Sequence, residues 1–247
     1  MTARKPSFSG EQFVSHVEAQ DLTVATAIRL YEKYLDDLVR VRAEQRALHD
    51  GGMKAQLDDI EAELTYLRLR ETTPETVVEI GSLHGWSTTW ILRALRDNGV
   101  GHLSTFDIVD GARRNVPTSL ADGRWTFVQG DVRDTMDAFP AGIGYLFVDA
   151  AHTARFARWY LAHVFPRLSP GTPVSVHDVY HHARPLPFSE GSVVLNWLAE
   201  QKIQPFTSAK AAAADDYERL TRARARLGLA EPVHPGTANP MIFFRTR

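Results

Sequence analysis

Residues 77–90, VVEIGSLHGWSTTW, combine an apolar run, a turn with two glycines and the start of a helical pattern. The β-branched residues at the beginning favour a β-strand. Gly81 and Gly85 allow backbone conformations and a close ligand approach that a Cβ atom would prevent. Ser87 and Thr88 can cap a following helix, whose first N–H groups suit a carboxylate or a phosphate. The stretch therefore predicts a strand, a ligand-binding turn and a helix.

Short apolar runs continue to alternate with helical patterns after this stretch. The strand-like runs are LSTFD (103–107), WTFVQ (125–129), IGYLFVD (143–149), TPVSVHD (172–178), IQPFTSA (203–209) and PMIFFRTR (240–247). Strands that alternate with helices predict βαβ units and a mostly parallel sheet covered on both faces. In such sheets, ligands bind beyond the carboxyl ends of the strands. We therefore expect a doubly wound α/β domain over residues 73–247.

The first part of the chain has a different pattern, in which apolar residues recur at helical spacing among charged ones. Residues 10–70 read as helix, with a break at 49–52 and an end before Pro74. We expect residues 1–72 to form a helical extension that covers the main domain or makes an oligomer contact. Within the main domain, residues 180–190 and 207–238 are candidate lid segments.

Composition excludes several classes of protein. The 247 residues contain no cysteine, which removes disulfides, thiolate metal sites and cysteine nucleophiles. The formal net charge of −2 and the interleaving of acids and bases give no field that would recruit nucleic acid or a membrane surface. The first residues lack the apolar core of a signal peptide, and no apolar run approaches the length of a membrane span. We expect a cytoplasmic homo-oligomer that acts on a small molecule.

Three nucleotide-binding patterns compete for the glycine turn. The dinucleotide fingerprint needs three glycines, and Leu83 and Trp86 occupy two of those positions. The phosphate-binding P-loop needs a lysine that this turn lacks. The remaining pattern, Glu79-x-Gly81-x-x-x-Gly85, resembles motif I of class I S-adenosylmethionine-dependent methyltransferases. In that family the loop runs beneath the methionine part of the cofactor.

Two further strand ends extend the resemblance. LSTFD ends on Asp107, where the family places the acid that binds the ribose hydroxyls, and a carboxylate can accept two hydrogen bonds from such a diol. FVQGDV ends the third strand at Gly130 and Asp131, which resembles the segment that contacts adenine. The cofactor residues that this resemblance implies are Glu79, Gly81, Ser82, Gly85, Ser87, Thr88, Asp107, Gly130, Asp131, Val132 and Asp149.

Acidic and histidine residues end the next two strands. Asp149 follows the fourth strand, with His152 three residues later, and His177 and Asp178 end the fifth. Because adjacent strand ends converge, the two carboxylates and an imidazole could hold a divalent cation with open positions for substrate. His152 could act as general base, since its ordinary pKa lies near neutrality. The alternative is that Asp149 caps a helix and His177 binds backbone.

The Asp-x-x-His arrangement also resembles the macrocin O-methyltransferase and cephalosporin-hydroxylase-like families, which methylate hydroxyls of microbial natural products. That resemblance implies Asp149, His177 and Asp178 as Mg²⁺ ligands and His152 as the base. His177 replaces the first acid of the family's acidic pair, so Mn²⁺, another transition metal or no metal becomes an alternative.

The sequence thus predicts a Rossmann-like, doubly wound fold with a mostly parallel seven-stranded sheet and an N-terminal helical extension. The expected activity is S-adenosylmethionine-dependent O-methylation of a small natural-product or sugar acceptor, with a possible Mg²⁺ or Mn²⁺ and a histidine base. A metal-independent methyltransferase is the alternative. A nicotinamide-dependent oxidoreductase is disfavoured by the broken glycine fingerprint, and a non-catalytic binding module is the third class.

Overall fold

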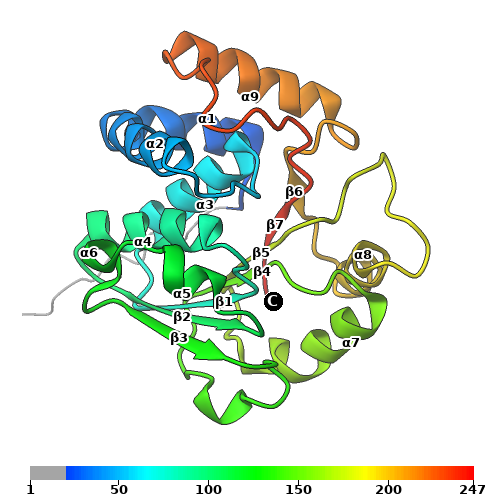
Figure 1. Ribbon diagram of the computed structural model, residues 1–247. Helices are drawn as coiled ribbons and strands as arrows, with labels where there is room; N and C mark the ends of the chain where they lie inside the picture. The colour runs from blue at the N-terminus through cyan, green and yellow to red at the C-terminus, as the bar shows by residue number, and fades with distance from the viewer. Residues whose placement is uncertain (1–20) are drawn as a thin grey trace, which may run out of the picture.

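A seven-stranded sheet forms the centre of the computed structural model, which describes residues 21–247 (Figure 1). The strands are β1 (Thr76–Ile80), β2 (His102–Asp107), β3 (Trp125–Gln129), β4 (Tyr145–Val148), β5 (Pro173–Val176), β6 (Phe206–Thr207) and β7 (Ile242–Arg245). Their spatial order is β3-β2-β1-β4-β5-β7-β6, and β7 runs antiparallel to both of its neighbours while the other pairs are parallel. The predicted sheet is confirmed.

The sheet separates two hydrophobic cores. Along β1, Val77 belongs to one core and Val78 to the other, and Phe243 and Phe244 of β7 divide in the same way. This follows from the two-residue period of a strand, which sends successive side chains to opposite faces. The central strands β4 and β5 are buried along their whole length, as expected for parallel strands that are covered on both sides.

Helices cover both faces of the sheet. The face that bears Val77 is covered by α4 (Trp86–Asn98), with the short helices α5 (Gly111–Asn115) and α6 (Thr118–Ala121) beside it. The opposite face is covered by α7 (Ala154–His163) and α8 (Glu190–Glu200), which pack against each other. Single-turn helices lie at Met136–Ala138 and Phe165–Arg167. The domain is therefore doubly wound.

The N-terminal helices belong to the same folded unit. They are α1 (Val24–Lys33), α2 (Leu35–Asp50) and α3 (Asp59–Thr72), and α3 packs on α4. Their apolar side chains share one core with Trp86, Trp90 and Phe243 of the main domain. The predicted break at residues 49–52 lies at the end of α2, and a further break occurs at Tyr34. The helix expected over residues 10–20 lies outside the described residues.

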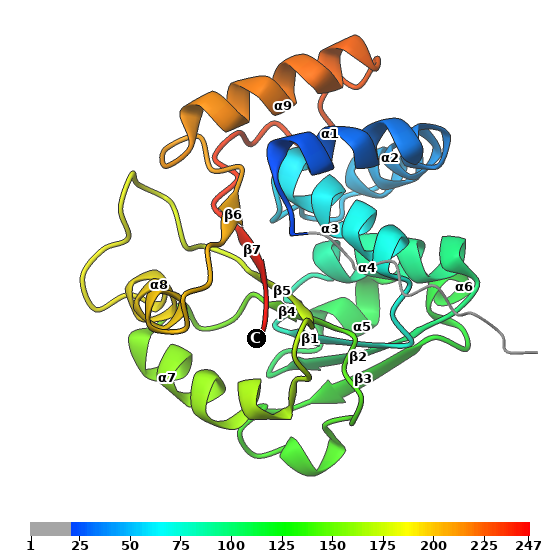
Figure 2. The same cartoon turned by 180° about the vertical axis from the view of Figure 1, so that it is seen from behind.

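Buried ion pairs join α9 (Ala214–Arg226) to the N-terminal helices, above which it lies in both views of the ribbon (Figures 1 and 2). Glu63 of α3 accepts hydrogen bonds from Arg224 Nε at 2.7 Å and from the Tyr31 hydroxyl at 2.7 Å, and it also pairs with Arg42. A buried charge needs such partners because desolvation is costly. Arg224, which lies in the second candidate lid segment (207–238), is thus paired with an acid of the N-terminal helices.

No helix among residues 21–247 is both long enough and apolar enough to cross a membrane.

Candidate active site at the carboxyl ends of the strands

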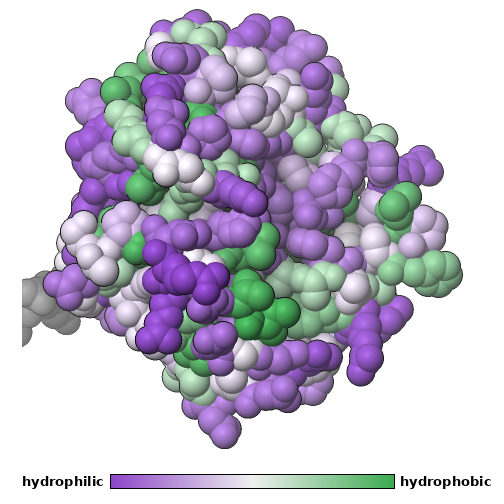
Figure 3. Space-filling model, in the orientation of Figure 1, coloured by the Kyte–Doolittle hydropathy of each residue, from purple (hydrophilic) through white to green (hydrophobic). Residues whose placement is uncertain are grey.

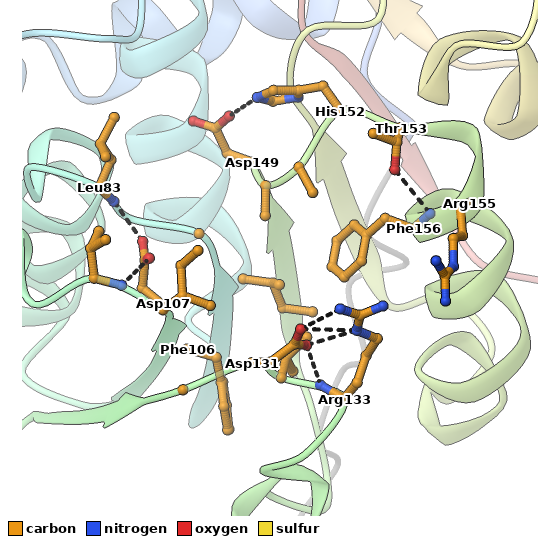
Figure 4. A pocket seen from close by; sticks show the side chains of 18 residues that line it. Leu83, Phe106, Asp107, Asp131, Arg133, Asp149, His152, Thr153, Arg155 and Phe156 are labelled. Carbon is orange, nitrogen blue, oxygen red and sulfur yellow. Dashed lines mark hydrogen bonds and ion pairs between the residues drawn. The ribbon is translucent and has the colours of Figure 1, made fainter.

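A cavity of about 440 Å³ opens beyond the carboxyl ends of β1, β2, β3 and β4 (Figure 4). This volume falls in the range of small-molecule sites, roughly 300–1,000 Å³. The cavity is lined by segments from each strand end, namely residues 80–83, 106–109, 130–133 and 149–156 with few exceptions. In Figure 4, Asp149 and His152 lie at one end of the group, and Asp131 and Arg133 lie at the other.

Gly81 makes the turn that opens this cavity. Its φ is +87°, and a Cβ added there would lie 1.9 Å from the carbonyl oxygen of Asp149. Any other residue would therefore push the ends of β1 and β4 apart. Gly85, with φ of +89°, starts α4, where a Cβ would lie 2.8 Å from Val116 Cγ2. Both glycines are required by close packing as well as by their backbone conformation.

Glu79 lies beneath the turn rather than in the cavity. Its fully buried carboxylate accepts hydrogen bonds from Ser87 Oγ at 2.6 Å, Thr88 Oγ1 at 2.7 Å and Thr105 Oγ1 at 2.8 Å. Desolvation raises the pKa of Glu79 to about 7, and the three hydroxyl groups only partly offset it. Glu79, Ser87 and Thr88, predicted to bind cofactor, here bind one another and hold the start of α4 to β1 and β2.

Asp107 connects the second strand to the glycine turn. Its Oδ2 accepts hydrogen bonds from the backbone N–H groups of Ser82 at 2.6 Å and Leu83 at 2.7 Å, and from Ser82 Oγ at 3.1 Å. Its Oδ1 accepts one from the Val109 N–H at 3.0 Å. Asp107 lines the cavity, whereas Ser82 does not line it and instead donates hydrogen bonds to Asp107. A carboxylate held in this way is placed in advance for a ligand hydroxyl.

The other wall combines an ion pair with apolar side chains. Arg133 Nε lies 2.9 Å from Asp131 Oδ1, and its hydrogen bonds lower the pKa of the Asp131 carboxyl. Phe106, Val132 and Phe156 line the interior. The large exposed apolar side chains at the rim are Leu83, Ile108 and Val109. Figure 3 shows apolar surface beside the hollow in the middle of this face.

His177 is buried among three carboxylates. Its Nε2 lies 3.0 Å from Glu61 Oε1, on α3, and its Nδ1 lies 3.1 Å from Asp149 Oδ1. A second oxygen, Asp178 Oδ1, lies 3.2 Å from the same Nδ1. Burial opposes the charged form of His177, but Asp149 and Glu61 outweigh it and raise its pKa well above the usual range. Asp149 itself is desolvated, yet the charge of His177 holds its pKa below the usual value.

His152 stands opposite His177 across Asp149. Its Nε2 lies 3.5 Å from Asp149 Oδ1 and 3.3 Å from Asp178 Oδ2, while its Nδ1 lies 3.2 Å from Glu190 Oε2. The hydrogen bond with Glu190 is the main cause that raises the pKa of His152, and it acts against burial. Ala151, His152 and Asp178 all have positive φ values, of 52°, 38° and 57°. Strain of this kind often occurs at functional sites.

The geometry offers a different cation site from the one the family resemblance implies. One ligand atom from each of Asp149, His152 and Asp178 lies within 4.8 Å of the others, which suits a divalent ion. Both ring nitrogens of His177, by contrast, already face carboxylate oxygens. His177 would have to give up one of these partners to bind a metal, so it fits the role of support better than that of ligand.

Two acids of this site were not found from the sequence, namely Glu61 and Glu190. Glu61 lies in the N-terminal helices, and Glu190 follows a serine at the start of a helix, where an acid is common. Both side chains are buried, at 0% and 2% exposure. Burial of an acid is the signal that marks them, and it becomes visible only in the folded chain.

Residues 78–179 match the family model described as a methyltransferase domain. This segment carries β2, β3, β4 and β5 and most of the strand ends that line the cavity. A search of curated protein sequences finds no match to the chain. The predicted methyltransferase is confirmed by the family match.

Solved structures confirm the predicted Rossmann-like fold. A proposed O-methyltransferase from Klebsiella pneumoniae is 20% identical with a TM-score of 0.56, and the match covers 90% of this chain and 96% of that one. TomG from Streptomyces achromogenes, an O-methyltransferase of tomaymycin synthesis solved with S-adenosylmethionine (SAM), is 15% identical with a TM-score of 0.53, covering 95% and 94%. Podospora anserina methyltransferase PaMTH1, bound to S-adenosylhomocysteine (SAH), is 15% identical with a TM-score of 0.50, covering 92% and 98%. At these identities the likeness establishes the fold, and SAM, the predicted cofactor, is a ligand of proteins that share it.

Proposed function

We propose that this protein is a SAM-dependent O-methyltransferase that acts on a hydroxyl group of a small natural-product or sugar acceptor. The observation that carries the proposal is the arrangement of the cavity in the methyltransferase domain. Asp107 and Asp131 line it beside the glycine turn, and Asp149 and His152 line it at the opposite end. Cofactor-holding and proton-accepting groups thus border one continuous space.

The cavity residues suit the parts of SAM. Asp107 is positioned for the ribose hydroxyls, because its carboxylate is already oriented by the turn. Phe106, Val132 and Phe156 offer apolar surface for a base, with Asp131 at its edge. Gly81 leaves room for close approach to the backbone, which a side chain would close. The methyl end of the cofactor would then point towards His152.

Methyl transfer needs alignment and removal of one proton. SAM supplies an electrophilic methyl group, so the new O–CH₃ bond forms as the S–CH₃ bond breaks and SAH leaves. His152 Nε2 takes the hydroxyl proton of the acceptor, because Nδ1 is already engaged by Glu190. Asp149 and Asp178 flank Nε2 and stabilise the imidazolium that results. Holding the acceptor oxygen behind the methyl group provides much of the remaining rate enhancement.

A divalent cation fits the same cluster. Asp149 and Asp178 would supply its oxygen ligands, and a bound cation would lower the pKa of an acceptor hydroxyl. His152 Nε2 is close enough to be a third ligand, but it cannot bind a cation and take a proton at the same time. A metal-independent methyltransferase is the second candidate, and the pairing of Asp149 with His177 favours it, since that pairing neutralises part of the charge a cation would need.

Calorimetric titration tests the cofactor assignment. We expect SAM and SAH to bind, and we expect Asp107→Asn to weaken both by about 10-fold or more through loss of a charge-assisted hydrogen bond. Asp122→Asn, at an exposed position outside the cavity, is the matched control. Binding of a nicotinamide dinucleotide in place of SAM would contradict the proposal. Transfer of a labelled methyl group to a panel of sugar and aromatic alcohols then identifies the acceptor class.

A further inference from the structure

Glu190 is a buried acid at the start of α8 with an unusual environment. Its side chain is 2% exposed, and one carboxylate oxygen, Oε2, lies 3.2 Å from His152 Nδ1. The other oxygen, Oε1, has no hydrogen-bond partner among residues 21–247. We propose that Glu190 is the positioning residue of His152: it accepts the Nδ1–H bond and thereby aims Nε2 at Asp149, Asp178 and the cavity. The inference rests on the proposed function of His152.

A backbone bridge brings His152 and Glu190 together. Thr153 and Ser189 form an isolated antiparallel bridge between the β4 exit and the loop that precedes α8. His152 directly precedes Thr153, and Glu190 directly follows Ser189. Gly191 adds a second restraint, because a Cβ there would lie 2.9 Å from the Val179 carbonyl oxygen, at the β5 exit. Glu190 is therefore fixed against the two strand ends that carry the site.

Helix capping does not account for this placement. Ser189 already caps α8, since its Oγ accepts the Ser192 N–H at 3.2 Å. An acid in the first turn is favoured by the helix dipole, but an exposed acid gives that benefit without the cost of burial. Burial of Glu190 is costly, and the interactions the structure gives in return are the contact with His152 Nδ1 and the neighbouring Tyr160 hydroxyl. Of these two partners, His152 is the one that belongs to the acidic cluster.

The proton on Nδ1 determines which nitrogen of His152 carries the lone pair. When Nδ1 carries the proton, the lone pair of the neutral imidazole is on Nε2, the nitrogen that faces Asp149 and Asp178. That tautomer is required whether Nε2 takes a proton or binds a cation, because histidines in both roles are oriented by a partner on the other nitrogen. The role of Glu190 is thus independent of which use Nε2 has.

Two substitutions of Glu190 separate positioning from charge. Glu190→Gln keeps an oxygen that accepts the Nδ1–H bond, whereas Glu190→Met keeps the length of the side chain without an acceptor. We expect kcat of Glu190→Met to fall by about 10- to 100-fold, the usual loss for such a partner, and Glu190→Gln to retain most of it. SAM affinity should not change in either variant, since Glu190 does not line the cavity. Glu200→Gln, exposed at the other end of α8, is the control.

Nitrogen-15 NMR of His152, assigned by comparison with His152→Gln, gives a readout that does not depend on activity. At a pH where the ring is neutral, we expect the Nδ1–H form in the wild type and in Glu190→Gln, and a mixture of tautomers in Glu190→Met. Wild-type kcat together with an unchanged tautomer in Glu190→Met would overturn the proposal. If Glu190→Met does not fold, Glu190→Asp decides, because it shortens the reach to His152 and should show the same losses. A wild type that binds SAM but transfers no methyl group would refute the proposed function, while the tautomer measurement would still test Glu190.

Discussion

Glu61 of α3 and His177 after β5 are joined by a buried contact of 3.0 Å between Oε1 and Nε2. The Glu61 carboxylate also accepts the Asp58 N–H at 2.9 Å and the Met241 N–H at 3.1 Å, at the start of β7. One side chain from the N-terminal helices thus connects the cap of its own helix, the antiparallel strand and the acidic cluster. The N-terminal helices therefore help to build the candidate site as well as cover the sheet.

Removal of His177 should destabilise the protein strongly. In His177→Ala, Glu61 remains buried without its partner, and breaking one side of such a pair costs about 3–5 kcal/mol. His182→Ala, an exposed histidine, should change the free energy of unfolding by less than about 0.5 kcal/mol. Urea denaturation at pH 6 measures both. Equal stability of the two variants would mean that the buried contact contributes nothing.

The raised pKa of His177 also predicts a pH dependence of stability. The folded pKa lies above the ordinary value of 6.5, so the folded state binds the proton more tightly than the unfolded state. This contribution is fully present below pH 6.5 and is lost as the pH rises through the folded pKa. Unfolding free energies measured from pH 6 to pH 9 should decline in the wild type. In His177→Gln the part of the decline due to this residue should be absent, whereas His182→Gln should follow the wild type.

The raised pKa of Glu79 predicts a second pH dependence of the free energy of unfolding, at lower pH. Its pKa rises from 4.5 to about 7 on folding, so its contribution is present below pH 4.5 and is lost as the pH rises to about 7. The shift corresponds to about 3 kcal/mol for this fully buried group. Glu79→Gln should be more stable than the wild type at pH 8 and should lose that advantage at pH 4.5. Glu218→Gln, exposed on α9, is the control. A Glu79→Gln variant that is less stable at pH 8 would refute the desolvation argument.

The sequence predicts the strand ends well and the side-chain partners poorly. Asp107, Asp131 and Asp149 were expected at the cavity because each ends a parallel strand, and topology alone places them there. Ser87 and Thr88 were expected to meet cofactor, but Glu79 points from the strand towards α4 and takes both hydroxyls. A charged residue within an apolar strand needs buried partners, and the two hydroxyls supply them; a role for Ser87 and Thr88 towards the cofactor stays a prediction.

Glu61 and Glu190 show why the other residues of the site could not be predicted from the sequence. Both come from helices whose packing depends on the whole chain, and each meets a histidine from a different element. The family resemblance places a metal ligand at residue 177. In the structure, Glu61 of α3 places a carboxylate against His177 Nε2, so the geometry fits His177 as a support of the site better than as a metal ligand. Strand order cannot reveal this contact, because Glu61 comes from a helix. That the ligand set is Asp149, His152 and Asp178 remains a proposal.

Binding of Mn²⁺ distinguishes the two ligand sets directly. We expect His152→Gln to weaken Mn²⁺ binding and folded His177→Gln to retain it, because only His152 belongs to the group whose ligand atoms lie within 4.8 Å. Asp178→Asn should weaken binding under either ligand set. His181→Gln is the matched control, since its Nε2 contacts Asp178 Oδ1 at 2.9 Å from outside that group. Electron paramagnetic resonance of free Mn²⁺ measures affinity without an activity assay. If EDTA leaves methyl transfer intact and the wild type binds no Mn²⁺, the metal-independent candidate holds.

Gly81 offers the sharpest steric test of the cofactor turn. In Gly81→Ala the new Cβ would lie 1.9 Å from the Asp149 carbonyl oxygen, and the positive φ adds strain. Gly123→Ala is a matched control, since its φ is +70° but no atom lies within 4 Å of the added Cβ. The control should lose about 1 kcal/mol from backbone strain alone, and Gly81→Ala should lose about 1–3 kcal/mol more from overpacking. Thermal unfolding measures the difference, and SAM titration of the folded fraction should show weaker binding only in Gly81→Ala. If both variants lose the same stability and both keep SAM affinity, then the ends of β1 and β4 are not in the close contact on which the cavity depends.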